Sequence, residues 1–240
     1  MSNQLPSESH NVCIILAGGF GTRLKSVIPD KPKCLAPIGN KSFLEIQLGL
    51  LKHQGIDNFV LSLGHMANLV QEEVEKLRVE FNISYVIEET PLGTGGAVLH
   101  VMNALNIEEA MVTNGDTFLG GDLGAMLSSL NLKDDELCRM AVIEVPDMTR
   151  YGGVELKGNR LIGFKEKGQT GAGLINAGFY RLSKQAFLAT QLPTAFSFET
   201  SLMPSLSNKN MVTASIFAGD FIDIGVPEGY IKFCNYFQQL

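Results

Sequence analysis

The chain has 240 residues, with 19 lysines and arginines against 25 aspartates and glutamates, a net charge of −6 and an isoelectric point near 5.3. Hydrophobic residues make up 45% and charged residues 18%, which excludes a disordered chain and predicts a compact fold with a sizeable core. The acidic balance excludes a general basic surface for nucleic acid. The sequence also shows no signal peptide and no apolar run long enough to span a bilayer, so we expect neither nucleic acid nor a membrane as a partner.

The cysteines indicate a reducing compartment. Cys13, Cys34, Cys138 and Cys234 are widely spaced and form no CxxC pair, so we expect reduced thiols and a cytoplasmic protein. Residues 1–11 are polar and predict a loose extension, with a single domain over 12–240. The sequence leaves the oligomeric state open, with a homodimer as one option.

The first half of the chain alternates short apolar runs with amphipathic stretches, which is typical of an α/β fold. Residues 12–17 are apolar at every position and predict a central strand covered on both faces. Ser42 and Glu45 form a capping box at the start of a helix that ends near Gly55. Further strands are predicted at 59–63, 83–87 and 110–113, and helices at 67–81, from about 95, and at 122–130.

The second half begins with an antiparallel subregion at about 137–182. Strands are predicted there at 137–145, 153–156, 161–165 and 174–182. A helix at 198–206, a strand at 211–217 and a closing helix at 227–237 complete the chain.

A glycine-rich, basic loop, Leu-Ala-Gly-Gly-Phe-Gly-Thr-Arg-Leu at 16–24, follows the first strand. Ligands of open α/β sheets bind beyond the carboxyl ends of strands, and glycines let backbone N–H groups approach phosphate. From Arg23 to Lys33 the chain carries four basic residues and one acid, Asp30, a pattern that predicts a site for a nucleoside triphosphate. The alternative is a solvated basic loop. The dinucleotide fingerprint is excluded because Leu24 stands where Gly or Ala is needed, and no G-x-x-x-x-G-K-[ST] occurs.

Two aspartates follow or interrupt apolar runs. Asp116 ends Asn-Gly-Asp after the strand at 110–113, and Asp223 lies in Phe-Ile-Asp-Ile-Gly. Burying an unpaired carboxylate is costly, and two from distant segments fit Mg²⁺ held together with substrate phosphates. A turn role for Asp116 and a structural ion pair for Asp223 are the alternatives.

Two further loops offer weaker signals. The sequence Glu-Thr-Pro-Leu-Gly-Thr-Gly-Gly-Ala at 89–97 offers backbone groups to a base edge or ribose, although such a turn is often a plain connection. In Phe-Lys-Glu-Lys-Gly at 164–168, Glu166 suits sugar hydroxyls and Lys167 a phosphate, with an exposed hairpin as the alternative. The sequence shows no signature of a nucleophilic serine or cysteine.

Five motifs of the chain, taken in their order, resemble the motifs of the sugar-1-phosphate nucleotidyltransferases. They are LAGGFGTRL with PDKPK, PLGTGGA, NGD, FKEKG with NAG, and FIDIGVPEGY. The resemblance covers nearly the whole chain after residue 11. It implies a Rossmann-like, mostly parallel, mixed central sheet with helices on both faces and a small antiparallel sugar-binding part. Three stretches are most similar to those of family members that use GTP and D-glycero-D-manno-heptose 1-phosphate. They are PLGTGGA, FSFE at 196–199 and IDIGVPE.

The resemblance also implies roles for individual residues. The nucleotide would be bound by Leu16, Ala17, Gly18, Gly19, Gly21, Thr22, Glu89, Gly93 and Thr94. Catalysis would depend on Arg23, Lys33, Asp116, Lys167 and Asp223, of which Asp116 and Asp223 would bind Mg²⁺. The sugar would be bound by Tyr151, Gly152, Glu166 and Asn176.

The expected reaction is attack of a sugar 1-phosphate oxygen on the α-phosphorus of a nucleoside triphosphate, with release of pyrophosphate. A phosphate monoester is largely dianionic at neutral pH, so no general base is required. Three alternatives stay open: a hexose 1-phosphate with a thymidine, uridine or cytidine nucleotide, a non-catalytic sensor of sugar nucleotides, and an oxidoreductase, which Leu24 disfavours.

Overall fold

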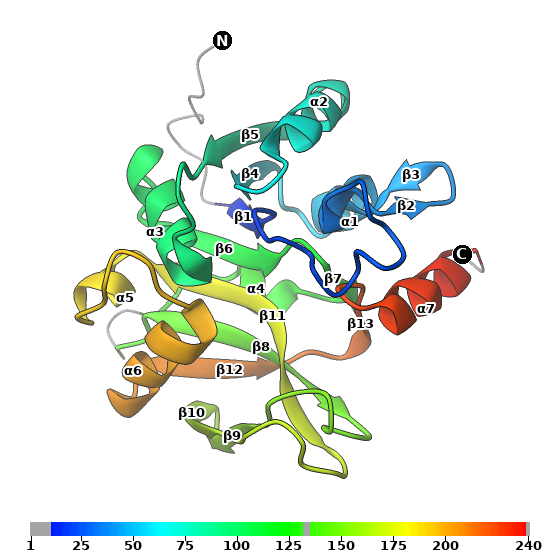
Figure 1. Cartoon of the computed structure of the whole chain (residues 1–240). Helices are drawn as coiled ribbons and strands as arrows, with labels where there is room; N and C mark the ends of the chain where they lie inside the picture. Colours follow the sequence, from blue (N-terminus) through cyan, green and yellow to red (C-terminus); the bar gives the residue numbers. More distant parts are fainter. Residues whose placement is uncertain (1–10, 132–134, 239–240) are drawn as a thin grey trace.

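The structure is a computed structural model that describes residues 11–131 and 135–238 (Figure 1). The predicted extension at 1–11 therefore lies outside the described residues except for Asn11. Within the described parts of the chain, no helix is both long and apolar enough to cross a bilayer.

A nine-stranded mixed sheet forms the centre, in the order β5-β4-β1-β6-β11-β8-β12-β10-β9. Its strands are β1 (Val12–Leu16), β4 (Asn58–Leu63), β5 (Asn82–Ile87), β6 (Glu109–Asn114), β8 (Cys138–Val145), β9 (Val154–Lys157), β10 (Arg160–Phe164), β11 (Gly173–Ser183) and β12 (Val212–Ile216). The first four strands of this order run parallel, and β11 is antiparallel to both β6 and β8. The predicted α/β fold class is confirmed. The strands of the predicted antiparallel subregion continue the main sheet, with the β9–β10 hairpin at its edge.

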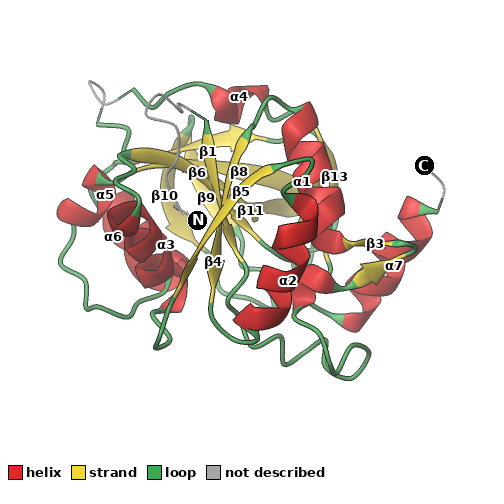
Figure 2. Cartoon of the chain, turned by 90° about the horizontal axis from the view of Figure 1, so that it is seen from above, coloured by secondary structure: helices red, strands yellow, loops and turns green. Residues whose placement is uncertain are grey.

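Helices cover both faces of the sheet (Figure 2). One face packs against α1 (Phe43–His53), α2 (Ala67–Leu77) and α4 (Gly124–Leu127). The other packs against α3 (Gly93–Ala104), α5 (Gln185–Leu188), the π-helical turn η3 (Phe198–Leu202) and α6 (Met203–Asn208). A short 3-10 turn, η1 (Lys33–Leu35), adds Cys34 and Leu35 to the cluster on the α1 face, whereas the closing helix α7 (Pro227–Phe237) packs on a separate cluster.

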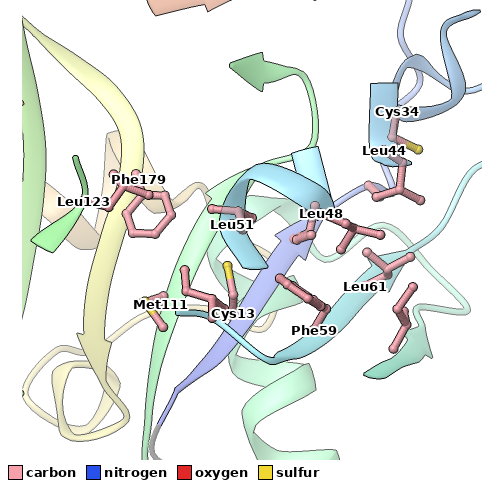
Figure 3. Close-up of a cluster of buried hydrophobic side chains, with 14 of the residues drawn as sticks. Cys13, Cys34, Leu44, Leu48, Leu51, Phe59, Leu61, Met111, Leu123 and Phe179 are labelled. Carbon is pink, nitrogen blue, oxygen red and sulfur yellow. The ribbon is translucent and has the colours of Figure 1, made fainter. Parts of the chain in front are cut away.

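The side chains of β1 explain why helices cover both faces of the sheet. Successive side chains of a strand point to opposite faces. Cys13 and Ile15 accordingly join the cluster under α1 and α2, part of which Figure 3 shows, and Val12 and Ile14 join the cluster under α3. All four are 2% exposed or less, as the fully apolar run predicts.

Helix α1 begins as its sequence predicts. The Ser42 hydroxyl accepts a hydrogen bond from the Glu45 backbone N–H at 3.2 Å, which satisfies one of the free donors of the first turn. Leu44, Leu48 and Leu51 form its buried stripe (Figure 3), and the chain leaves the helix through Gly55 at a positive φ of 88°.

Several elements differ from the sequence-based expectation, including the helix predicted at 67–81, which ends at Leu77. The helix predicted at 122–130 is wrong in extent, because only Gly124–Leu127 is helical and Ser128 is already extended. The helix predicted at 198–206 starts as η3 and continues as α6 to Asn208. The antiparallel pair β7 (Thr117–Gly121) and β13 (Gly219–Asp223) was not predicted, nor was the hairpin β2 (Pro37–Ile38) and β3 (Lys41–Ser42).

The β7–β13 pair rests on a core of its own. Phe118 and Ile222 face one another across the pair and pack with Phe233 of α7 and Phe43 of α1, all at most 4% exposed. The closing helix thereby fixes the strand that ends at Asp223.

Candidate active site

A cavity of about 460 Å³ opens beyond the carboxyl ends of β1 and β6. This is where open α/β sheets bind ligands. Of the residues predicted for the site, the cavity is lined by Leu16, Gly18, Gly19, Arg23, Lys33, Gly93, Thr94, Asp116, Tyr151, Asn176 and Asp223.

The two aspartates meet because β7 and β13 pair. Asp116 precedes β7, Asp223 is the last residue of β13, and the antiparallel register sets Asp223 opposite Thr117. The Ile224 N–H donates to the Asp116 carbonyl at 2.9 Å and closes the end of the pair. Residues more than a hundred positions apart therefore share one corner of the cavity.

Gly225 lies directly against both carboxylates. A Cβ atom at this position would be 2.7 Å from Oδ2 of Asp116 and 2.8 Å from Oδ1 of Asp223. Both oxygens thus come within a few ångströms of one point, and a glycine is needed there for space.

The charges at this corner are unevenly balanced. The Lys33 ammonium forms an ion pair with Asp116, whereas Asp223 accepts a backbone hydrogen bond from Gly225 at 2.8 Å. Burial, followed by the nearby Asp116 carboxylate, raises the pKa of Asp223, although Arg23 and Lys33 partly offset this. A further cation between the two carboxylates would relieve their repulsion.

The residues at this corner fit a divalent metal. The described parts of the chain contain no group of three or more His, Cys, Asp or Glu side chains that could hold an ion. Mg²⁺ does not need such a cage, because it keeps several waters and is bound by one or two carboxylates together with substrate phosphates. The two aspartates match that donor set.

The glycine-rich loop joins β1 to the Lys33 segment. Gly21 has a positive φ of 63°, and a Cβ atom there would meet Cγ of Lys33 at 2.9 Å. Gly21 therefore lets the loop turn over the stem of Lys33, whose head reaches Asp116. Arg23 is exposed at the cavity wall, where a guanidinium is suited to bind a phosphate.

The second glycine-rich loop is packed against a distant segment. The Gly95 N–H donates to the Phe196 carbonyl at 3.0 Å, and a Cβ atom on Gly95 would lie 2.2 Å from the Phe196 ring. The Thr94 hydroxyl donates to Glu199 at 2.9 Å and accepts from the Phe198 N–H at 2.8 Å. This docking brings the Glu199 carboxylate into the cavity wall beside Thr94.

On the opposite wall, β11 bulges where it passes the cavity. Its pairing with β8 shifts between Asn176 and Tyr180, and Gly178 has a positive φ of 71°. The Asn176 amide donates to the Tyr180 hydroxyl at 2.5 Å and accepts from the Gly178 N–H at 2.9 Å. Tyr151 also lines this wall, with its ring edge-on to Phe221 at 5.7 Å.

Several predicted site residues do not line the cavity. These are Ala17, Gly21, Thr22, Glu89, Gly152, Glu166 and Lys167. Glu89 is exposed and its neighbour Glu88 lines the cavity instead, accepting a hydrogen bond from the Leu92 N–H at 3.1 Å. Glu166 and Lys167 are exposed in the loop that follows β10.

Sequence reasoning missed other lining residues. They are Phe20, Ser62, Glu88, Pro91, Ala97, Asn114, Thr117, Ala177, Gly178, Glu199 and Phe221. Most are neighbours of predicted residues in the same motifs. Glu199 and Ser62 belong to other segments, and for Glu199 the signal in the sequence was the Phe-Ser-Phe-Glu run at 196–199.

Comparison with known proteins identifies the family of this chain. A family model described as "Nucleotidyl transferase" matches residues 12–239. The chain belongs to the nucleotidyl transferase family. The family generally uses a divalent metal ion, in line with the carboxylate pair.

Two curated relatives align over almost their whole length. D-glycero-alpha-D-manno-heptose 1-phosphate guanylyltransferase of Campylobacter jejuni is 42% identical over 92% of this chain and 97% of its own. The enzyme of the same name from Aneurinibacillus thermoaerophilus is 37% identical over 91% and 95%. Among solved structures, HddC from Yersinia pseudotuberculosis, in complex with GMP-PN, has a TM-score of 0.82 and 35% identity over 94% of this chain and 99% of its own. The chain is thus an enzyme of the nucleotidyl transferase family, and both of these relatives are named as guanylyltransferases.

Proposed function

We propose that this nucleotidyl transferase transfers GMP from GTP to D-glycero-D-manno-heptose 1-phosphate, giving GDP-heptose and pyrophosphate. The observation that carries the proposal is the corner where Lys33, Asp116 and Asp223 meet at the end of the cavity. The names of the two curated relatives supply the base and the sugar.

The reaction exchanges one phosphorus–oxygen bond for another. An oxygen of the sugar 1-phosphate forms a bond to the α-phosphorus of GTP while the bond from that phosphorus to the β-phosphate oxygen breaks, and pyrophosphate leaves with the electron pair. The attacking group is already an anion at neutral pH, since the second pKa of a phosphate monoester is about 6. The site therefore needs to position two anions and neutralise their repulsion, not to remove a proton.

The chain's own residues divide this work. Arg23 and Lys33 would bind the triphosphate, and for Lys33 this means exchanging its ion pair with Asp116 for a phosphate oxygen. Asp116 and Asp223 would hold Mg²⁺, which when bound supplies positive charge to the phosphates. Tyr151 and Asn176 would face the sugar from the opposite wall, and Gly93, Thr94 and the loop from Leu16 to Gly19 would face the nucleoside.

The cytoplasm remains the proposed compartment. Cys13, Cys34 and Cys138 are buried thiols, and burial raises the pKa of Cys34 to about 12, so that it stays protonated and unreactive. Reduced, inert cysteines suit a reducing compartment.

The proposal is tested by pyrophosphate release, measured with Mg²⁺ for each of the common nucleoside triphosphates against heptose, mannose and glucose 1-phosphates. We expect the highest kcat/KM with GTP and the heptose 1-phosphate. A faster reaction of another pair would reassign the substrates, and tight binding of GDP-heptose without any turnover would make the protein a sensor.

A further inference from the structure

Gln47 of α1 lies directly behind the turn that carries Asp116. Its side chain is 5% exposed, and its amide nitrogen donates to the Asn114 carbonyl at 2.9 Å and to the Thr117 carbonyl at 3.0 Å. These two carbonyls flank Gly115 and Asp116, so both amide hydrogens are used to clamp the turn from either side.

The clamp is kept at an energetic cost. The amide oxygen of Gln47 is buried and has no hydrogen-bond partner among the described residues. A buried acceptor without a partner destabilises the fold, and an apolar side chain of similar size would avoid this cost. Neighbouring positions of α1, such as Leu44, Leu48 and Leu51, are apolar and equally buried. A glutamine at this position is therefore explained by its two donors and not by packing.

The turn is also fixed by its backbone. The Gly115 N–H donates to the Leu16 carbonyl of β1 at 3.0 Å, and the Asp116 carbonyl accepts from the Ile224 N–H at 2.9 Å. A Cβ atom on Gly115 would lie 2.7 Å from the Leu16 carbonyl oxygen, so the turn sits tightly on β1. Gln47 holds the same turn from a third direction, by its hydrogen bonds from α1.

We propose that Gln47 is a positioning residue that sets the Asp116 carboxylate for the metal and the nucleotide. The inference rests on the proposed function for its consequence in catalysis. Without the clamp, the turn is free to move away from α1, and the Asp116 oxygen leaves the point it shares with Asp223. A displacement of about 1 Å costs on the order of 100-fold in rate when reacting groups are held in place.

The chain offers a matched control on the same helix. Gln54, which caps α1, accepts a hydrogen bond from the Leu123 N–H at 3.2 Å and so ties α1 to a loop away from the cavity. Gln47→Leu removes the two hydrogen bonds that the Gln47 amide donates, and Gln54→Leu removes the one that the Gln54 amide accepts. A purely structural role of Gln47 would affect both variants through stability alone.

Two measurements separate the roles: the Kd of Mn²⁺ in the presence of GTP, by electron paramagnetic resonance, and the Mg²⁺ concentration that gives half-maximal pyrophosphate release. For Gln47→Leu we expect both to rise about 10-fold and kcat to fall about 10- to 100-fold. For Gln54→Leu we expect wild-type values. If Gln47→Leu does not fold, Gln47→Glu, which keeps the volume but loses the paired donors, takes its place with the same expected rise.

Equal metal dependence of the Gln47 and Gln54 variants would overturn the inference. A wild-type protein that binds Mn²⁺ but releases no pyrophosphate with any substrate pair would instead overturn the proposed function. In that case the Mn²⁺ titration still decides the role of Gln47.

Discussion

Replacing Gly225 by alanine probes the corner of the site where the two carboxylates meet. The new methyl group would lie 2.7 Å from Oδ2 of Asp116, 2.8 Å from Oδ1 of Asp223 and 3.3 Å from the Lys33 ammonium. Contacts below 3.0 Å are essentially never seen for a real Cβ atom, so both carboxylates must withdraw by several tenths of an ångström. The φ of Gly225 is not positive, so lack of space is the reason for the effect.

The expected result is a loss of activity larger than the loss of stability. Overpacking costs about 1–3 kcal/mol, and displacement of reacting groups by a fraction of an ångström lowers the rate by roughly 10- to 100-fold. The assay is pyrophosphate release with GTP and heptose 1-phosphate, combined with thermal unfolding. The control is Gly49→Ala on α1, where nothing lies within 4 Å of the added Cβ and alanine favours the helix by about 1 kcal/mol. Wild-type kcat/KM in Gly225→Ala would refute the reasoning.

Three further predictions concern other parts of the molecule. Asp116→Asn should retain the fold, seen by circular dichroism, and lower pyrophosphate release at least about 100-fold, because the charge that holds the metal is lost; wild-type turnover would remove Asp116 from the metal site. Gly95→Ala should destabilise the protein by about 1–3 kcal/mol and raise the KM for GTP, because the methyl group would meet the Phe196 ring; an unchanged melting temperature would contradict this docking. Burial disfavours the charged form of Glu136. The hydrogen bonds that its carboxylate accepts, the strongest from Arg139, have the larger effect and hold the pKa of Glu136 below the usual value of 4.5. Glu136 therefore stabilises the fold above pH 4.5 and loses this contribution as the pH falls through the lowered pKa, so the melting temperatures of wild type and Glu136→Gln should differ near neutral pH and converge in acid.

Local signals in the sequence were sufficient for the elements that carry the site. The apolar run of β1 predicts a doubly covered strand, and Ser42 with Glu45 predicts the start of α1, because both signals depend on near neighbours. The closing helix was predicted at 227–237 and is found at Pro227–Phe237, with proline in its first turn.

Signals that depend on distant partners were missing from the sequence. β7 and β13 are short, contain glycine, and become strands because they pair with each other across about a hundred residues. The position of Glu199 also depends on a distant segment. Glu199 reaches the cavity because the glycines at 93 and 95 let its segment approach α3.

The glutamate that lines the cavity lies one residue before the predicted Glu89, and the reason is the geometry of a strand end. Glu88 and Glu89 follow β5 in succession, and successive side chains at a strand end point to opposite sides. The sequence predicted a glutamate at this wall, and the structure places the first of the two there and leaves the second exposed.

The central claim is that Asp116 and Asp223 together hold the metal that neutralises the phosphates. The most direct measurement is a crystal structure with GDP-heptose and Mn²⁺, in which anomalous scattering locates the ion. The account predicts one peak bonded to a carboxylate oxygen of each aspartate and to the diphosphate. A manganese ion bound elsewhere, with the two carboxylates turned away from the diphosphate, would contradict it.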